Sequence, residues 1–215
     1  MSSRGRAARL TLACLGVAVG VVLARRESLR WGATEGEVAA GLPGDDLVPD
    51  PQLVATRAIS VRTSPAEVWP WIVQMGQGRA GFYSYDLLEN LVGCDIHSAD
   101  RIVPEWQELA VGDEVLLHPD GGLRVEIVDP GRAFVLRGAA PAGSAPAPYE
   151  FSWAFVLRDA PGGTTRLVVR ERYGYTQPWS ALLVEPVEWV SLLMSQRMLR
   201  GVKQRAELEA RGPAA

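Results

Sequence analysis

Five short segments of alternating hydrophobicity, separated by turn-forming residues, occupy residues 114–173 and constrain the fold more than any other feature. Leu123, Val125 and Ile127 share one face of the second segment, and every second residue from Phe151 is apolar in the fourth. A period of two is typical of strands, and clustered proline, glycine and aspartate favour tight turns. The pattern predicts an antiparallel meander with one apolar face. The expected strands span residues 114–118, 123–128, 133–137, 151–158 and 165–173.

The C-terminal residues supply a cover for that apolar face. Apolar side chains recur near helical spacing and predict a long helix that begins at Trp179 or Pro186 and runs through Glu209. A start at Pro186 would place the proline in the first turn, where its missing N–H is tolerated. The helix is expected to turn its apolar side to the sheet. Its apolar positions include Val187, Val190, Met194 and Val202.

The residues before the meander predict one strand and two short helices. Residues 53–61 alternate as a strand does. Ser64 and Glu67 then form a capping box, which marks the start of a helix, and Asp86 with Glu89 marks a second, shorter helix. The whole order predicts an α+β helix-grip arrangement, in which an antiparallel sheet wraps around a long C-terminal helix.

The run GQGRAGFYSYD at residues 76–86 contains a literal G-x-G-x-x-G, the pattern of dinucleotide-binding loops. That pattern requires a preceding strand, whereas Gly76 follows a predicted helix and suits its C-terminal cap. We therefore expect neither a nucleotide cofactor nor any other cofactor. Two alternatives remain for this loop, a lid or cavity wall and a rigid packing loop.

The charge and the cysteine content of the chain argue against two classes of function, nucleic-acid binding and metal binding. The 215 residues carry a net charge of −3, and the first thirty contain six arginines against one glutamate, so the rest of the chain is acidic. This balance predicts no nucleic-acid binding. Cys14 and Cys94 are the two cysteines, too few for a disulfide framework or a metal knuckle. No metal site is expected.

The N-terminus contains an uncharged apolar run at residues 10–24, flanked by arginines on both sides. Its length of about 22 Å falls short of the roughly 30 Å hydrocarbon core. We predict that residues 1–26 form an N-terminal apolar helix and a membrane anchor, so that the protein is membrane-associated through residues 10–24. The alternative is a cleaved signal segment and a secreted protein. Residues 27–52, rich in glycine and proline, predict a linker, and residues 53–210 the folded domain.

Four segments together resemble the START/Bet v 1-like superfamily, and in particular its polyketide cyclase/dehydrase-like (SRPBCC) members. The resemblance covers about residues 53–208 and implies a helix-grip fold with a cavity that takes lipids, sterols, polyketides or similar molecules. It implies no single reaction, because carriers and enzymes share this fold. The segments are VWPWIVQMGQGRAGFYSYD (68–86), DIHSADRIVPEWQ (95–107), VGDEV (111–115) and MLRGVKQRAE (198–207).

Two charged residues lie in phase with the apolar face of their strands. Glu171 is in phase with Leu167 and Val169, and Arg57 with Ile59. If that face lines a cavity, these groups either contact a polar ligand group or pair with each other; otherwise both lie near strand ends in water. The ligand-binding candidates are Arg57, Arg79, Phe82, Tyr83, Tyr85, Trp153, Glu171, Met194 and Met198.

Acid–base catalysis would require a side chain that can donate or accept a proton. His97 lies between acidic and hydroxyl residues, a cluster that suits a general acid or base, although the same residues also suit a structural turn. The catalytic candidates are His97, Asp100, Glu171 and Tyr83.

These observations lead to three hypotheses. The first is a membrane-tethered protein that binds a hydrophobic small molecule, such as a lipid, an isoprenoid or a polyketide-like compound, in an internal cavity. The second is a cyclase or dehydrase acting on such a molecule. The third is a membrane-linked interaction module whose cavity is filled by its own side chains.

Overall fold

The computed structural model describes residues 3–138 and 147–212, and the side chains from Leu15 onward except that of Ala18. One six-stranded antiparallel sheet has the order β1-β6-β5-β4-β3-β2. The strands are β1 (Leu53–Val61), β2 (Glu114–His118), β3 (Gly121–Asp129), β4 (Ala133–Gly138), β5 (Tyr149–Ala160) and β6 (Thr164–Tyr175). The five predicted meander strands and the first strand are all present.

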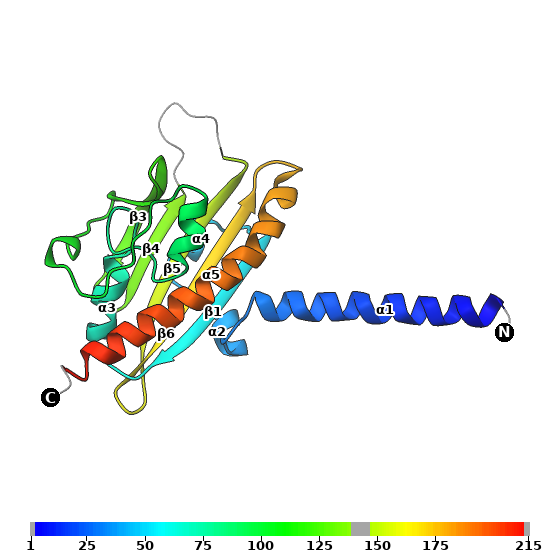
Figure 1. Ribbon diagram of the computed structural model, residues 1–215, viewed down its shortest axis with the longest axis horizontal. Helices are drawn as coiled ribbons and strands as arrows, with labels where there is room; N and C mark the ends of the chain where they lie inside the picture. The colour runs from blue at the N-terminus through cyan, green and yellow to red at the C-terminus, as the bar shows by residue number, and fades with distance from the viewer. Residues whose placement is uncertain (1–2, 139–146, 213–215) are drawn as a thin grey trace.

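Three of the helices cover one face of the sheet (Figure 1). The long helix α5 crosses one face of the sheet, with α3 and α4 on the same side (Figure 1). This is the predicted helix-grip fold, with two short helices after the first strand. The helices are α1 (Ser3–Ser28), α2 (Glu35–Ala39), α3 (Pro65–Val73), α4 (Asp86–Leu91) and α5 (Ser180–Glu209), with short 3-10 turns at Asp45–Leu47 and Pro104–Trp106.

The orientation of α5 differs from the expectation. The helix begins at Ser180, so Pro186 lies inside it and not in its first turn. Val187 and Val190 are 50% and 58% exposed, whereas Glu188 is 1% exposed. At these positions α5 turns an acidic side chain toward the sheet and two valines outward, because Glu188 pairs with the buried Arg57.

The C-terminal half of α5 packs closely on the loop after α3. A Cβ atom added to Gly201 would lie 2.4 Å from the carbonyl oxygen of Tyr83. Tyr83 has a positive φ of 57°, and its backbone N–H donates a 3.0 Å hydrogen bond to Ser98 Oγ. The loop is therefore held against the helix at a point where only glycine fits.

We expect Gly201→Ala to lower the free energy of unfolding by about 1–2 kcal/mol, because overpacking outweighs the helix propensity gained. Gly36→Ala in α2, where an added Cβ approaches only Thr34 Oγ1 at 4.0 Å, is the matched control and should change stability little. Chemical denaturation measures both. Equal effects of the two substitutions would contradict this close contact.

The membrane location predicted for the N-terminus is not supported. None of the helices in the described part of the chain combines the length and hydropathy needed to cross a bilayer. Residues 10–14 and 18 of the predicted segment lie outside the described side chains. Helix α1 extends away from the sheet (Figure 1).

The segment predicted as a linker packs on the outer face of the sheet. Leu42 joins Ala58, Val156 and Val168 in a small apolar cluster. Arg170, 3% exposed, donates hydrogen bonds to the carbonyl oxygens of three segment residues, and also to Thr56 and Asp45. The three carbonyls belong to Glu37, Val38 and Ala40. Both faces of the sheet are thus covered around β1 and β6. Whether residues 53–210 fold without this segment stays a prediction.

Candidate functional site

A cavity of about 680 Å³ lies between the sheet, α4 and α5. Its wall combines aromatic rings and methionines with a few polar groups. Strands β5 and β6 place alternate side chains on this face, and the inward side of α5 closes it. The lining residues include Phe82, Ser84, Glu89, Cys94, Leu117, Asp120, Leu123, Tyr149, Phe151, Trp153, Glu171, Tyr173, Ser191, Met194, Ser195 and Met198.

Five of the ligand-binding candidates line this cavity. Phe82 and Trp153 place their rings 6.1 Å apart between centroids, Glu171 comes from β6, and Met194 and Met198 come from α5. The structure therefore brings together residues that are up to 116 positions apart in sequence. Their roles in ligand binding stay predictions.

The expected pairing of Arg57 with Glu171 is present. Arg57 Nη1 lies 3.0 Å from Glu171 Oε1, and Arg57 Nη2 lies 2.6 Å from Glu188 Oε1. The side chains of all three residues are 4% exposed or less. The hydroxyls of Ser191 and Ser195 donate to the Glu171 carboxylate at 2.8 Å and 3.1 Å. Glu171 is thus a compensated carboxylate in the cavity wall.

A second arginine extends this network to the N-terminal helix. Arg25, near the end of α1, pairs with Glu188 and Glu185 of α5. Glu188 therefore lies between two guanidinium groups, Arg57 on the sheet side and Arg25 on the outer side. Burial raises the pKa of Glu188, whereas Arg25 and Arg57 act in the opposite direction. Two arginines therefore face the two buried glutamates, and Arg25 also pairs with Glu185, whose side chain is 45% exposed.

The remaining ligand-binding candidates of the loop after α3 do not line the cavity. Arg79 donates to the backbone carbonyls of Val73 and Trp106 and so braces its own loop. Tyr83 is 2% exposed, and its hydroxyl accepts a 2.8 Å hydrogen bond from Gln74 Nε2. Tyr85 faces outward at 36% exposure. This loop contributes packing, and of its predicted binding residues only Phe82 reaches the cavity.

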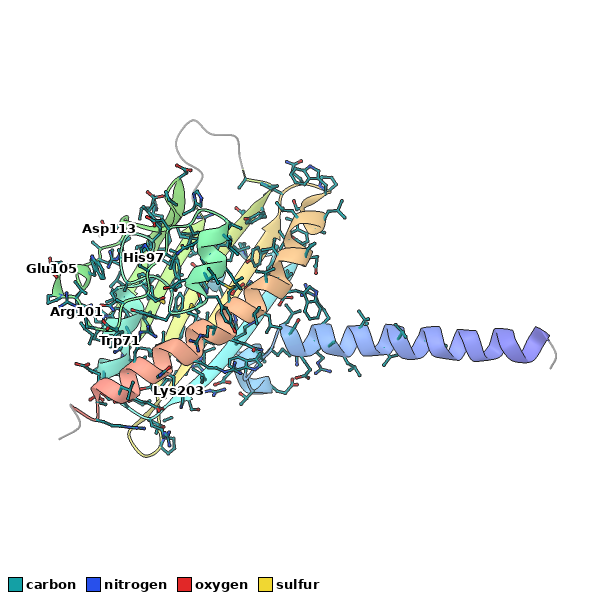
Figure 2. All side chains as sticks on the ribbon, in the orientation of Figure 1. Trp71, His97, Arg101, Glu105, Asp113 and Lys203 are labelled. Carbon is teal, nitrogen blue, oxygen red and sulfur yellow. The ribbon has the colours of Figure 1, made fainter. Side chains whose placement is uncertain are left out.

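The four catalytic candidates are not brought together. His97, labelled in Figure 2, has a side chain that is 81% exposed and faces Asp95 at 3.2 Å. Asp100 lines a separate surface hollow with Arg205. Burial raises the pKa of the Tyr83 hydroxyl well above its ordinary value, and only Glu171 lies in the cavity wall.

Glu89 is a cavity residue that the sequence pattern did not reveal. Its position in the first turn of α4 suggested a helix cap, yet α4 has no side-chain cap. Instead Glu89 Oε1 accepts a 2.6 Å hydrogen bond from Ser84 Oγ, and Glu89 Oε2 is buried without a hydrogen-bond partner among the described residues. Burial raises the pKa of Glu89, and Asp86 adds to this effect.

Ser191 and Ser195 were also missed, although a signal existed. Together with Glu188 and Met198 they recur at spacings of three and four residues, which places them on one side of a helix. A row of polar residues along one side of a helix that also contains many apolar residues indicates that polar groups face the interior of the domain.

Within the described residues, no group of three histidine, cysteine, aspartate or glutamate side chains is placed to hold a metal ion.

Comparisons with known proteins return structures and no sequence family. No family model matches the sequence, and no curated protein matches it. Norcoclaurine synthase from Thalictrum flavum has 13% identity and a TM-score of 0.44, covering 71% of this chain and 84% of that chain. A Nitrosospira multiformis protein has 11% identity and a TM-score of 0.47, covering 74% and 99%. XoxI from Bacillus cereus has 15% identity and a TM-score of 0.44, covering 75% and 100%. Likeness at this level says nothing about what this chain binds.

Proposed function

We propose that this protein binds a hydrophobic small molecule in the cavity between the sheet and α5. The observation that carries the proposal is the cavity itself, about 680 Å³ in volume and walled by aromatic rings and methionines. Cavities of this size and character commonly enclose small ligands. Isoprenoid and polyketide-like molecules fit this description. A core filled by its own side chains does not agree with a cavity of this volume.

Binding is proposed ahead of catalysis because of where the acid–base candidates lie. A general acid or base must come within hydrogen-bond reach of the reacting group. His97, Asp100 and Tyr83 are absent from the residues that line the cavity. A cyclase or dehydrase reaction in this cavity would therefore depend on other lining groups, such as Glu171 or Glu89, and no further observation favours it.

Native mass spectrometry of the full chain, followed by organic extraction, tests the proposal directly. A defined apolar molecule that copurifies with the protein would support it. Titration with Nile red, a neutral fluorescent probe, provides a second test. Failure to copurify any apolar molecule, together with failure to take up Nile red, would contradict a binding function.

We expect Met194→Trp to weaken Nile red binding by at least about tenfold, equivalent to about 1.4 kcal/mol, because the larger ring occupies the cavity. Leu193→Trp is the matched control on the same helix, since Leu193 is 47% exposed and does not line the cavity. The control should bind Nile red as the wild type does. Equal loss in the two variants would place probe binding elsewhere.

A further inference from the structure

The charged side chains that line the cavity in the described part of the chain are all acidic. Three acidic residues line it, Glu89, Asp120 and Glu171, and its described lining contains no lysine, arginine or histidine. Residues 139–146, outside the description, carry no charged side chain in the sequence. Arg57 compensates Glu171. Asp120, with a side chain 92% exposed, is screened by water. Glu89 is therefore the carboxyl group that is least compensated in the cavity wall.

The local geometry of Glu89 leaves a hydrogen-bonding position free. Ser84 takes one oxygen, and the other, Oε2, is buried without a partner among the described residues. A buried polar atom without a partner is unfavourable, so a ligand that donates to Oε2 would remove an existing penalty. Phe82 and Trp153, which line the same cavity, provide aromatic faces of the kind that attract cations.

We propose that the cavity selects apolar molecules that carry a protonated amine, which Glu89 holds, and that it rejects carboxylates and phosphates. This inference rests on the proposed function, because it assigns a chemical class to the ligand of the same cavity. An ammonium group would pair with Glu89 and complete the hydrogen bonds of Oε2. An anion in the same place would be desolvated beside the Glu89 carboxylate, with no basic side chain in the described lining of the cavity, which is strongly unfavourable.

The pH dependence follows from the groups that face Glu89. Asp86 lies on α4 with Glu89, and Cys94 comes shortly after the end of that helix. Asp120 and Glu171 line the cavity together with Glu89. His118 approaches the adjacent Gly93, where an added Cβ would lie 3.6 Å from its Nε2. Burial raises the pKa of Glu89 above its ordinary value of 4.5. Affinity for an amine is therefore expected to rise as the pH rises through that pKa and to fall in acid, where Glu89 is protonated.

Three ligands with one apolar body test the proposal: 2-(1-naphthyl)ethylamine, 2-(1-naphthyl)ethanol and 1-naphthylacetate. Calorimetric titration of the full chain at pH 7.5 should show the amine binding at least about tenfold more tightly than the carboxylate, with the alcohol between them. Glu89→Gln keeps the shape of the side chain and removes its charge. This variant should bind the amine about tenfold more weakly than the wild type does and should bind the alcohol with unchanged affinity. Glu114→Gln, an exposed acid on β2, is the control.

Each other outcome contradicts the inference. Tighter or equal binding of the carboxylate would overturn the charge selectivity, and unchanged amine affinity in Glu89→Gln would overturn the role of Glu89. If no naphthyl ligand binds while Nile red does, the amine class is wrong and the cavity function stands. If Nile red also fails to bind, the proposed function itself fails.

Discussion

Replacing Arg57 by methionine will lower the free energy of unfolding by about 3–5 kcal/mol, because removing one partner of a buried ion pair leaves an uncompensated charge. Here two carboxylates lose their shared partner, Glu171 at 3.0 Å and Glu188 at 2.6 Å. Glu188 keeps Arg25, whereas Glu171 keeps only hydroxyl donors. Guanidinium denaturation of the wild type and the variant measures the difference.

Two further variants separate lost charge from lost packing. Arg57→Met combined with Glu171→Gln and Glu188→Gln removes the whole buried set and should recover a large part of the loss. Arg124→Met, at a side chain that is 56% exposed, should change stability by less than about 0.5 kcal/mol. The deficit of Arg57→Met should shrink as the pH falls, because protonation neutralises Glu188, whose pKa burial raises. A deficit no larger than that of Arg124→Met would contradict this account.

Replacing Arg170 by methionine is expected to lower the free energy of unfolding by about 3 kcal/mol, because buried acceptors lose their donor. The guanidinium of Arg170 makes five hydrogen bonds, to Thr56, to Asp45 and to three backbone carbonyls between residues 37 and 40. The variant should also release the segment before β1 from the sheet. Denaturation measures the first effect, and faster proteolysis within residues 29–48 reports the second.

Arg137→Met provides the comparison for Arg170→Met. Arg137 lies on β4 with a side chain that is 40% exposed and faces Glu150 at 3.6 Å, a surface pair worth little. It should leave both the denaturation curve and the proteolysis pattern close to wild type. If Arg170→Met lost stability without faster proteolysis of this segment, the segment would not depend on that arginine.

Local patterns were enough to predict the elements of the fold. The predicted strand at residues 53–61 has the bounds of β1, and the predicted meander strands match β2 to β6 within a few residues. Period-two alternation and turn chemistry are properties of neighbouring residues, so the sequence contains them directly. There were two exceptions: Val187 and Val190 of α5 lie outward, and the expected linker contains α2 and packs on the sheet.

The site was less accessible to prediction because its contacts are long-range. The phase of Glu171 and Arg57 indicated the cavity face, and their pairing followed. Nothing near Arg57 in the sequence indicates Glu188, which is 131 positions away. Glu89 has the same difficulty, since a carboxylate in the first turn of a helix usually interacts with the helix end. Glu89 lines the cavity because α4 lies on the same side of the sheet as α5 (Figure 1).

The position of Arg25 has an evolutionary consequence. A residue of α1 neutralises the outer side of Glu188, which the domain buries at 1% exposure. Selection on position 188 therefore depends on position 25, although the two belong to different parts of the chain. If a descendant of this sequence loses α1, and Arg25 with it, we expect a neutral residue to replace Glu188 as well. Arg57 and Glu171, which pair with each other on the face of the sheet under α5, would then be inherited together without Glu188.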